Sequence, residues 1–494
     1  MRWCFRTLCG LILLAGAITW LSCDRPTAPA NPNGPPDTKL ANIPPANDTI
    51  FALVTLNWSG GDYDGFITGY QYRYFTYHLA PGSRDVWDLF DSTKWADTTG
   101  SGATIAFNSS DSLNRQQFLV RAVDNDGNVD PTPAERIFYT PRTTPPITKI
   151  VQPVKNSKIL IVPAVTDWWL GVPLLIRAQD RTQFGSVVDY AWSVDGDQWN
   201  WVKDTLVYIT PDKFKAPLDG PHVIRVTSRN NTNLIDPVGD SAFVTLIIPS
   251  FDKKILIIDE TDEFNNPFIT FGIKDSTVDN FYAELFPGSD SWDFKLKGMP
   301  PREVLAHYML LVWQADDIPA SQPHKISDAQ NIEIFTDYLR VGGKFLMSGW
   351  RILKSFAYTQ GSPFVFPPGT FVHDYLHIGA GSETDYIGDC TGGNGKPGFF
   401  SDFRVDSVKL AGFPYGGKLS IVNLITFAAG FTDIMYGYVN RDNSPFVQYR
   451  GRTIGLRYYG SVFDAVVLGF PMYFVQKDDA KMMAREILHN MHVE

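Results

Sequence analysis

The spacing of hydrophobic residues changes once along the chain, close to residue 250. Before that point, apolar and polar residues alternate in short runs, and clusters of Gly, Asp, Asn and Pro lie between the runs. Examples of such runs are residues 66–75, 118–123, 172–179 and 242–248. Alternation of this kind is typical of strands that bury one face. The pattern therefore predicts two all-β sandwiches of the immunoglobulin or fibronectin type, over residues 46–143 and 144–250.

After residue 250 the apolar runs become continuous, at 255–258, 309–312, 344–347 and 466–470. Strands of a parallel sheet, which are buried on both faces, have this composition. Helical periodicity separates the runs, and Ser327 and Gln330 predict a capping box at the start of one helix. Residues 251–494 are therefore predicted to form an α/β doubly wound parallel-sheet domain, with an insertion at about 361–440 near the carboxyl ends of its strands.

The first predicted sandwich carries residues that point to a particular fold. Residues 56–74, LNWSGGDYDGFITGYQYRY, and residues 118–133, FLVRAVDNDGNVDPTP, resemble strands of a fibronectin type III domain, with Trp58 as its buried tryptophan. The resemblance implies a fold that serves binding, spacing and adhesion alike. The second sandwich follows the same plan more loosely.

The α/β half resembles the class I glutamine amidotransferase-like fold, a flavodoxin-like sheet. The resemblance rests on KKILIIDE at 253–260, YLRVGGKFLMSGW at 338–350 and VVLGFPMYF at 466–474. In catalytic members of that family a Cys follows the central strand, and a His and a Glu follow the last strand. Here Ser348 takes the first position and residues 469–473 read GFPMY. The resemblance therefore implies a domain that lacks the catalytic triad.

The N-terminus predicts export. Residues 1–22 contain Arg2, Arg6 and an apolar run that ends just before Cys23. This arrangement resembles a bacterial lipoprotein signal, in which Cys23 becomes the lipidated first residue. An ordinary signal peptide cleaved near this point is the alternative. Residues 23–45 are rich in Pro and Asn and predict a tether. We therefore expect a cell-envelope protein anchored to a membrane through Cys23, at the outer membrane or cell surface.

Composition agrees with an extracellular, β-rich protein and narrows its partners. Aromatic residues make up 14 % and charged residues 19 % of the chain, and the formal net charge of −10 gives no reason to expect nucleic acid as a partner. Of the four cysteines, Cys4 and Cys9 lie in the leader and Cys23 would carry lipid, so Cys390 has no partner. A disulfide framework and a Cys-ligated zinc site are both excluded.

Three residues are weak candidates for catalysis. Ser348 follows a predicted strand, but the leading glycine of a G-x-S-x-G motif is missing. Cys390 lies in a glycine-rich stretch, and His373 precedes it by fewer than twenty residues. A Cys and a His form a nucleophilic pair only if they meet in space. Small buried residues are the simpler interpretation of Ser348 and Cys390.

Polar and aromatic residues follow several predicted parallel strands where each one ends. Carboxyl ends of parallel strands share one edge of the sheet, where α/β proteins bind ligands. The sequence therefore predicts a polar, aromatic-walled cleft that would take a sugar or a peptide, formed by Asp259, Glu260, Trp313, Gln314, Asp316, Ser348 and Trp350.

Five aspartates lie in two loops of the first predicted sandwich: Asp62, Asp64, Asp124, Asp126 and Asp130. In the fibronectin plan the two loops share one end of the domain, so these carboxylates predict a possible calcium site. Ordinary Asp/Gly turns are the alternative. No other cofactor is predicted.

Two functions follow from these features. The first is a cell-envelope lipoprotein that presents a degenerate amidotransferase-like domain for binding or assembly, with envelope proteins or glycans as partners. The second is a secreted or surface hydrolase that acts on glycan or peptide at the carboxyl edge of the sheet. The missing triad favours the first, without deciding whether the chain is an enzyme.

Overall fold

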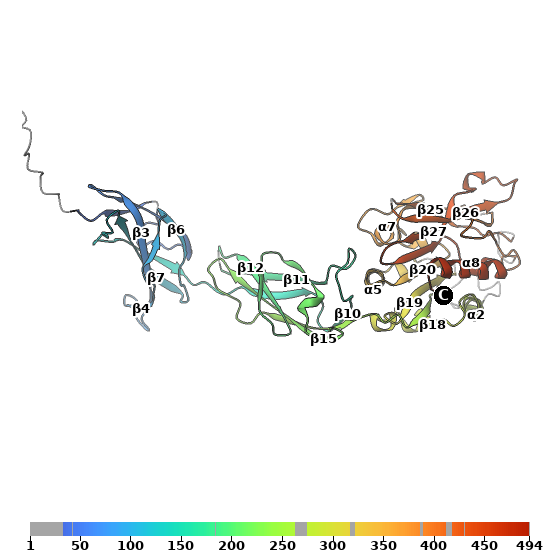
Figure 1. Cartoon of the computed structure of the whole chain (residues 1–494), viewed down its shortest axis with the longest axis horizontal. Coiled ribbons are helices and arrows are strands. Elements are labelled where there is room, and N and C mark those ends of the chain that lie inside the picture. Colours follow the sequence, from blue (N-terminus) through green and yellow to red (C-terminus); the bar gives the residue numbers. More distant parts are fainter. Residues whose placement is uncertain are drawn as a thin grey trace, which may run out of the picture.

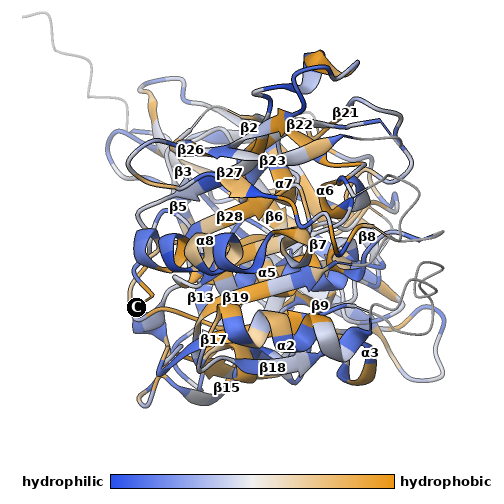
Figure 2. Ribbon diagram, turned by 90° about the vertical axis from the view of Figure 1, so that its right-hand side faces the viewer, coloured by the Kyte–Doolittle hydropathy of each residue, from blue (hydrophilic) through white to orange (hydrophobic). Residues whose placement is uncertain are grey.

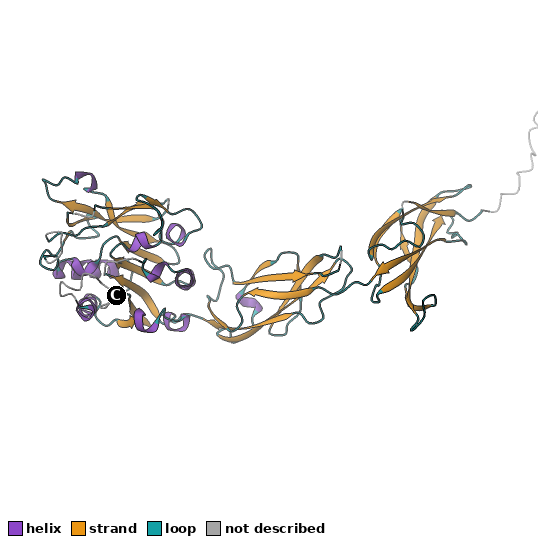
Figure 3. Cartoon of the chain, turned by 180° about the vertical axis from the view of Figure 1, so that it is seen from behind, coloured by secondary structure: helices purple, strands orange, loops and turns teal. Residues whose placement is uncertain are grey.

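The computed structural model describes residues 33–41, 43–182, 184–261, 274–316, 322–385, 389–411, 417–428 and 430–493. The predicted leader, Cys23 and residues 24–32 of the predicted tether lie outside the described residues. Three bodies follow one another along the long axis of the molecule, two of them β-sandwiches and the third a larger mixed domain (Figures 1 and 3). No helix in the described part of the chain is long and apolar enough to cross a membrane.

The first sandwich packs a three-stranded sheet against a larger one. The small sheet has the order β1-β2-β6, with β1 at Asp37–Ala41, β2 at Leu53–Gly61 and β6 at Gly102–Ala106. The larger sheet has the order β4-β3-β7-β8, with β4 at Trp87–Ser92, β3 at Ile67–Leu79, β7 at Leu113–Asp124, β8 at Ala134–Pro141, and β5 at Ala96–Thr98 paired to β3. Both sheets are antiparallel.

Trp58 is the centre of this sandwich, as the sequence predicts. Its side chain is 2 % exposed and stacks on Phe118 with 5.8 Å between ring centroids. Tyr70 and Tyr72 close the same cluster from β3. The indole Nε1 donates a hydrogen bond to the carbonyl oxygen of Gly100 at 3.1 Å, which satisfies the ring's polar atom inside the core.

Part of the predicted tether is a strand, which corrects the boundary at residue 45. β1 pairs with β2 so that Leu40 lies opposite Trp58, and Leu40 packs against the core. The Thr38 hydroxyl accepts a hydrogen bond from the backbone N–H of Ala122 at 2.8 Å. Residues 37–41 are polar enough to resemble a spacer, but the edge of the small sheet gives them a partner.

The second sandwich has a five-stranded and a three-stranded sheet. The larger sheet, in the order β10-β16-β15-β12-β13, contains β10 at Ser157–Leu160, β16 at Asp240–Ile247, β15 at Gly220–Asn230, β12 at Val187–Val194 and β13 at Asn200–Val202. The smaller sheet, in the order β14-β11-β9, contains β14 at Leu206–Ile209, β11 at Val172–Gln179 and β9 at Ile147–Gln152. A 3₁₀ turn, η1, spans Pro211–Lys213.

A nine-stranded mixed sheet organises the third body. Five neighbouring strands pair in parallel: β18 at Asp290–Asp293, β17 at Lys253–Asp259, β19 at Tyr308–Ala315, β20 at Lys344–Gly349 and β28 at Asp464–Leu468. Four antiparallel strands continue the sheet: β27 at Thr453–Tyr459, β26 at Thr432–Asn440, β23 at Cys390–Gly395 and β24 at Phe403–Arg404. The sheet is thus not parallel throughout, which corrects the predicted arrangement.

Helices cover both faces of this sheet, and the continuous apolar runs explain why. In β17, Ile255 and Ile257 face a core shared with α2 at Asp275–Leu285 and α8 at Lys477–Asn490, whereas Leu256 and Ile258 face a core shared with α5 at Ala329–Arg340. Because successive side chains point to opposite faces, a strand covered on both sides needs apolar residues at every position. Figure 2 shows the hydrophobic strands between the helices.

Shorter elements complete the third body. They are α3 at Phe294–Lys297, α4 at Arg302–Leu305, α6 at Ile352–Ser355, α7 at Phe371–Asp374, and the 3₁₀ turns η3 at Lys325–Ser327, η4 at Val447–Tyr449 and η5 at Met472–Phe474. The predicted capping box is wrong: Asp328 is the N-cap residue of α5 and makes no side-chain cap, while the Ser327 hydroxyl donates to the carbonyl of His324.

The predicted insertion at 361–440 divides between two sheets. β21 at Phe364–Val365, β22 at Ile378–Glu383 and β25 at Asn423–Phe427 form a separate three-stranded sheet. β23, β24 and β26 instead join the main sheet at its antiparallel edge. Much of the segment is therefore part of the domain's own framework.

The two joints between the bodies differ. At the first joint, Thr144 donates its backbone N–H to the hydroxyl of Thr182, and Phe51 meets Phe184 edge-on at 6.4 Å. At the second joint, one hydrophobic cluster runs from the second sandwich into the third body and includes Trp169 on one side and Tyr338 on the other. The second sandwich and the third body therefore share a core.

Candidate functional site

The carboxyl ends of the central parallel strands bring the predicted cleft residues together. Asp259 in β17 is in register with Gln314 in β19, and Gln314 is in register with Ser348 in β20. Gly349 allows this close spacing, because a Cβ there would lie 2.5 Å from the carbonyl oxygen of Ala315. Gly342 makes the turn into β20 with φ of 102°, which favours glycine.

All seven predicted cleft residues are buried, none with more than 4 % of its surface exposed. Hydrogen bonds satisfy most of their polar groups. Asp259 accepts hydrogen bonds from the backbone N–H of Thr261 at 2.8 Å and from the side-chain amide of Gln314, and Gln314 accepts one from the Thr261 hydroxyl at 2.6 Å. Buried polar groups need such partners, and here the neighbouring strands and loops supply them.

The two tryptophans do not wall an open cleft, which corrects the prediction. Trp313 packs against Phe294 and Phe335, and its Nε1 donates to Glu260 at 3.0 Å. Trp350 lies against Phe474 with 5.0 Å between ring centroids. Its Nε1 donates to the carbonyl of Ser420 at 2.9 Å. Each ring fills space between the sheet and its covering segments.

Glu260 and His324 belong to the same framework. Glu260 also accepts a hydrogen bond from the backbone N–H of Lys325, and the Nδ1 atom of His324 lies 3.8 Å from its carboxylate. The His324 Nε2 atom donates to the carbonyl oxygen of Trp350 at 2.7 Å. These contacts hold η3 against the ends of β17 and β20.

Ser348 lies inside β20 and not on a turn after it. It pairs with Gln314 on one side and with Leu468 on the other, and its surface is 0 % exposed. Its hydroxyl donates to the carbonyl of Phe470 at 3.1 Å and accepts the backbone N–H of Met472 at 3.0 Å. The left-handed backbone after this strand is at Arg351, with φ of 59°. The sharp turn therefore comes after the serine and not at it.

Asp316 and Tyr282 extend this network toward α2. The Tyr282 hydroxyl donates to Asp316 at 2.9 Å, and its oxygen lies 3.3 Å from the Ser348 hydroxyl. Asp316 also accepts the backbone N–H of Tyr473 at 2.9 Å. Burial and the neighbouring Asp316 carboxylate raise the pKa of Tyr282 well above its ordinary value, so the phenol stays protonated and remains a donor.

Two aspartates outside the set predicted from the sequence complete an acidic cluster at this edge. Asp275 and Asp279, on the first turns of α2, place carboxylate oxygens within 4.8 Å of one another and of Asp259. Burial, followed by the repulsion of Asp279, raises the pKa of Asp259 to about 9. Their spacing of four, which places two residues on the same face of a helix, was the available signal.

Carboxylate oxygens are ligands for hard divalent cations, so the donor set of this cluster fits such an ion. A proton on Asp259 relieves the same repulsion, and its raised pKa makes that proton stable at neutral pH.

The remaining catalytic candidates do not meet. Cys390 lies in β23, is 1 % exposed, and has no histidine partner among the described residues. Burial raises the pKa of its thiol to about 12. His373 lies in α7, where its Nδ1 pairs with Asp374 at 2.7 Å.

The two aspartate loops of the first sandwich share one end, and their oxygens accept hydrogen bonds. Asp124 accepts from the backbone N–H groups of Asp126 and Asn128, both at 2.8 Å. Asp64 accepts from Gly34 and Asp126 from Asn33, while Asp130 accepts from Thr132. Asp62, next to Asp64, has a raised pKa through partial burial and that neighbour. Calcium binding at these loops stays a prediction, since an ion would have to displace these donors.

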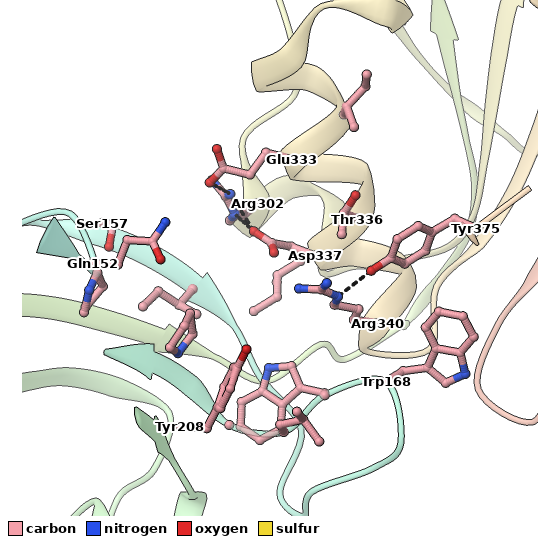
Figure 4. A pocket seen from close by; sticks show the side chains of 18 of the residues that line it. Gln152, Ser157, Trp168, Tyr208, Arg302, Glu333, Thr336, Asp337, Arg340 and Tyr375 are labelled. Atoms are coloured by element: carbon pink, nitrogen blue, oxygen red, sulfur yellow. Dashed lines mark hydrogen bonds and ion pairs between the residues drawn. The ribbon is translucent and has the colours of Figure 1, made fainter. Parts of the chain in front are cut away.

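An open cavity lies away from these buried residues, between the second sandwich and the third body (Figure 4). It measures about 720 Å³. One wall comes from β9, β10 and the loop around Trp168, and the other from α5 and α7. The sequence does not predict this cavity, because its two walls are separated by more than a hundred residues. The paired tryptophans at 168 and 169, in a stretch without strand periodicity, were the only local signal.

Ion pairs and aromatic rings organise this cleft. The Arg302 Nε donates to Asp337 at 2.9 Å, and its Nη2 lies 3.2 Å from Glu333. The Arg340 Nε donates to the Tyr375 hydroxyl at 2.6 Å. Trp168 reaches across from the second sandwich and packs against Tyr375, with 5.4 Å between ring centroids.

No family model matches the chain, and no curated protein is similar to it in sequence. Solved structures to which it is similar include fibronectin III-like modules of CbhA from Clostridium thermocellum, at 14 % identity over 43 % of this chain and 95 % of that one, with a TM-score of 0.20.

Two further solved structures match at similarly low identity. The FN1–FN3 domains of chicken CNTN1 match at 12 % identity over 44 % of this chain and 65 % of that one, with a TM-score of 0.20. A bacterial ice-binding adhesin matches at 10 % identity over 46 % and 72 %, with a TM-score of 0.18. Fibronectin III-like and immunoglobulin-like domains are thus among the solved structures that the chain matches.

Proposed function

We propose that this chain is an exported cell-envelope lipoprotein that binds a ligand or an envelope partner and does not use its third body as an enzyme. In this proposal, lipid on Cys23 anchors the chain and the two sandwiches act as spacers. The third body is a degenerate amidotransferase-like domain. The end-to-end order of the bodies supports the spacer role (Figure 1).

The observation that carries the proposal is the environment of Ser348. A nucleophile needs a hydroxyl that substrate can reach and a base that takes its proton. The hydroxyl of Ser348 is buried within a paired strand and already bonded to Phe470 and Met472. This serine acts as a structural bridge.

The second possible nucleophile has the wrong charge state. A thiol attacks as its thiolate. With a pKa raised to about 12 by burial, Cys390 is protonated at neutral pH, and its Sγ lies 3.4 Å from the carbonyl oxygen of Gly392. This supports a packing role for the side chain.

Active-site probes test the non-catalytic part of the proposal. The folded full chain, in detergent, is treated with a fluorophosphonate and with iodoacetamide, and modified peptides are identified by mass spectrometry. We expect no adduct at Ser348 or Cys390 in the folded protein. In guanidinium, Cys390 should react with iodoacetamide, which provides the positive control. A fluorophosphonate adduct at Ser348 in the folded protein would revive the hydrolase alternative.

Metabolic labelling with a palmitate analogue tests the anchor. The parent chain should incorporate the label and the Cys23→Ala variant should not. Cys9→Ala is the matched control, because Cys9 lies in the predicted leader and should leave labelling intact. Equal labelling of the parent and the Cys23→Ala variant contradicts lipidation at this position.

A further inference from the structure

The cleft between the second sandwich and the third body is held open by a rigid joint. Trp168 packs against Phe463 as well as Tyr375, with 4.9 Å between the Trp168 and Phe463 ring centroids. Lys158 of β10 forms an ion pair with Glu303 of α4. Since the two walls share a hydrophobic core, a ligand does not have to order them on binding, which favours affinity.

Aromatic rings are available inside the cleft. Tyr208 is 44 % exposed and points into the space between the walls, as Figure 4 shows. Trp168 is partly exposed at the other end, beside Tyr375. Rings at two separate positions offer flat apolar surfaces that suit the C–H face of a sugar.

The charges of the cleft nearly cancel. Its lining has the basic residues Lys158, Arg302 and Arg340 and the acidic residues Asp167, Glu333, Asp337 and Asp374. Arg302 is paired with Asp337 and Glu333, and Lys158 with Glu303. The lining has four acidic and three basic residues, so a phosphate or a carboxylate meets no surplus of positive charge. The lining therefore favours an uncharged ligand.

The polar groups suit hydroxyls in particular. Glu333 has 73 % of its side chain exposed and can accept hydrogen bonds, while Gln152 and Arg340 can donate them. A sugar hydroxyl both donates and accepts, so it can bond to both kinds of group on the two walls. The cavity of about 720 Å³ also falls within the range of about 300–1,000 Å³ for small-molecule sites.

We infer that this interdomain cleft binds a neutral oligosaccharide of a few sugar rings. The sugar rings stack on Tyr208 and Trp168, and their hydroxyls form hydrogen bonds with the wall that carries Glu333. The inference rests on the proposed binding function and gives it a site and a ligand class.

Calorimetric titration of the full chain in detergent tests this inference. The probes are hexasaccharides of β-1,4-linked glucose, N-acetylglucosamine, xylose and mannose, and of α-1,4-linked glucose. We expect at least one to bind at submillimolar concentration. The Tyr208→Ala and Glu333→Ala variants should each weaken that binding about tenfold, because each removes one of the two kinds of contact.

The matched control is Trp199→Ala. Trp199 belongs to the same sandwich and is 47 % exposed, but it does not line the cleft, so the variant should bind as the parent does. Circular dichroism of each variant checks its fold. Tyr208 and Glu333 are both solvent-exposed, so these substitutions should leave the protein folded.

Two outcomes overturn the inference. In the first, none of the five hexasaccharides binds at millimolar concentration. In the second, a sugar binds but both cleft variants retain full affinity, which puts its site elsewhere. Neither outcome depends on the probe experiment above: a reactive Ser348 refutes the non-catalytic function, whereas absent sugar binding with an unreactive Ser348 refutes only this inference.

Discussion

The hydroxyl of Ser348 lies 3.1 Å from the carbonyl oxygen of Phe470, and this hydrogen bond joins the end of β20 to the segment after β28. The backbone N–H of Met472 donates to the same hydroxyl at 3.0 Å. Two segments that are 122 residues apart are thus fixed by a single side chain. The Ser348 hydroxyl therefore bridges these two segments.

The Ser348→Ala variant should therefore lose stability. The substitution leaves the buried N–H of Met472 without its acceptor, which costs about 1–3 kcal/mol. Denaturant unfolding monitored by tryptophan fluorescence measures the loss. Ser291→Ala is the control, because Ser291 is exposed in β18 and should change stability by less than about 0.5 kcal/mol. Equal stability of the Ser348→Ala variant and the parent would contradict the bridging role.

The acidic cluster makes the stability of the third body depend on pH. The pKa of Asp259 is raised to about 9 in the folded protein, above an ordinary value of about 3.9 in the unfolded chain. Between these values the folded state holds a proton that the unfolded state has released, so stability falls as pH rises from about 4 to about 9 and then levels off.

Asp279→Asn should reduce that dependence. It removes the charge that repels Asp259 most strongly, lowers the pKa of Asp259, and should stabilise the protein at pH 8 more than at pH 5. Urea unfolding at both pH values measures the difference. Asp442→Asn is the control, since the Asp442 side chain is fully exposed. A gain that is the same at both pH values would contradict the link to Asp259.

The edge strand β1 gives a third prediction. Thr38→Val keeps the shape of the side chain but removes the oxygen that accepts the Ala122 N–H, and should destabilise the first sandwich by about 1–3 kcal/mol. Scanning calorimetry should resolve this as a lower Tm for one transition. Lys39→Ala, at an exposed neighbouring position, should leave that transition in place. If both variants melt like the parent, β1 contributes little to the sandwich.

The rigid joint gives a fourth prediction. Trp168→Ala removes the ring that contacts Tyr375 and Phe463, and should loosen the second sandwich from the third body while each keeps its own strands. Small-angle X-ray scattering should then record a broader distribution of interatomic distances, and proteolysis near residues 248–252 should become faster. Trp199→Ala should change neither measurement. Unchanged scattering of the Trp168→Ala variant would mean that other contacts hold the joint.

Local patterns in the sequence predict the elements well and the contacts between distant segments poorly. The resemblance to a fibronectin type III domain predicts the buried position of Trp58, and the continuous runs of β17, β19, β20 and β28 follow from burial on two faces. In contrast, β23 and β26 come from a segment whose Gly-rich composition resembles a loop. They become strands because the open edge of the sheet pairs with them.

The candidate sites show the same contrast between local patterns, which the sequence predicts well, and contacts between distant segments, which it predicts poorly. Register along a parallel sheet correctly brought Asp259, Gln314 and Ser348 together. Whether they face solvent depends on the segments that cover them, and spacing along a strand does not encode that. The interdomain cleft depends on the contact between Trp168 and Tyr375. These residues belong to different domains, so the periodicity of the sequence does not predict their contact.

The unequal joints have a mechanical consequence. Domains that share a large hydrophobic interface move as one, whereas small interfaces permit rotation. The second sandwich and the third body should therefore swing as a single arm about a pivot at residues 141–146, where the Phe51–Phe184 ring contact joins the described parts of the two sandwiches. Such a pivot lets the arm reorient toward a distant target without changing the shape of the cleft that it carries.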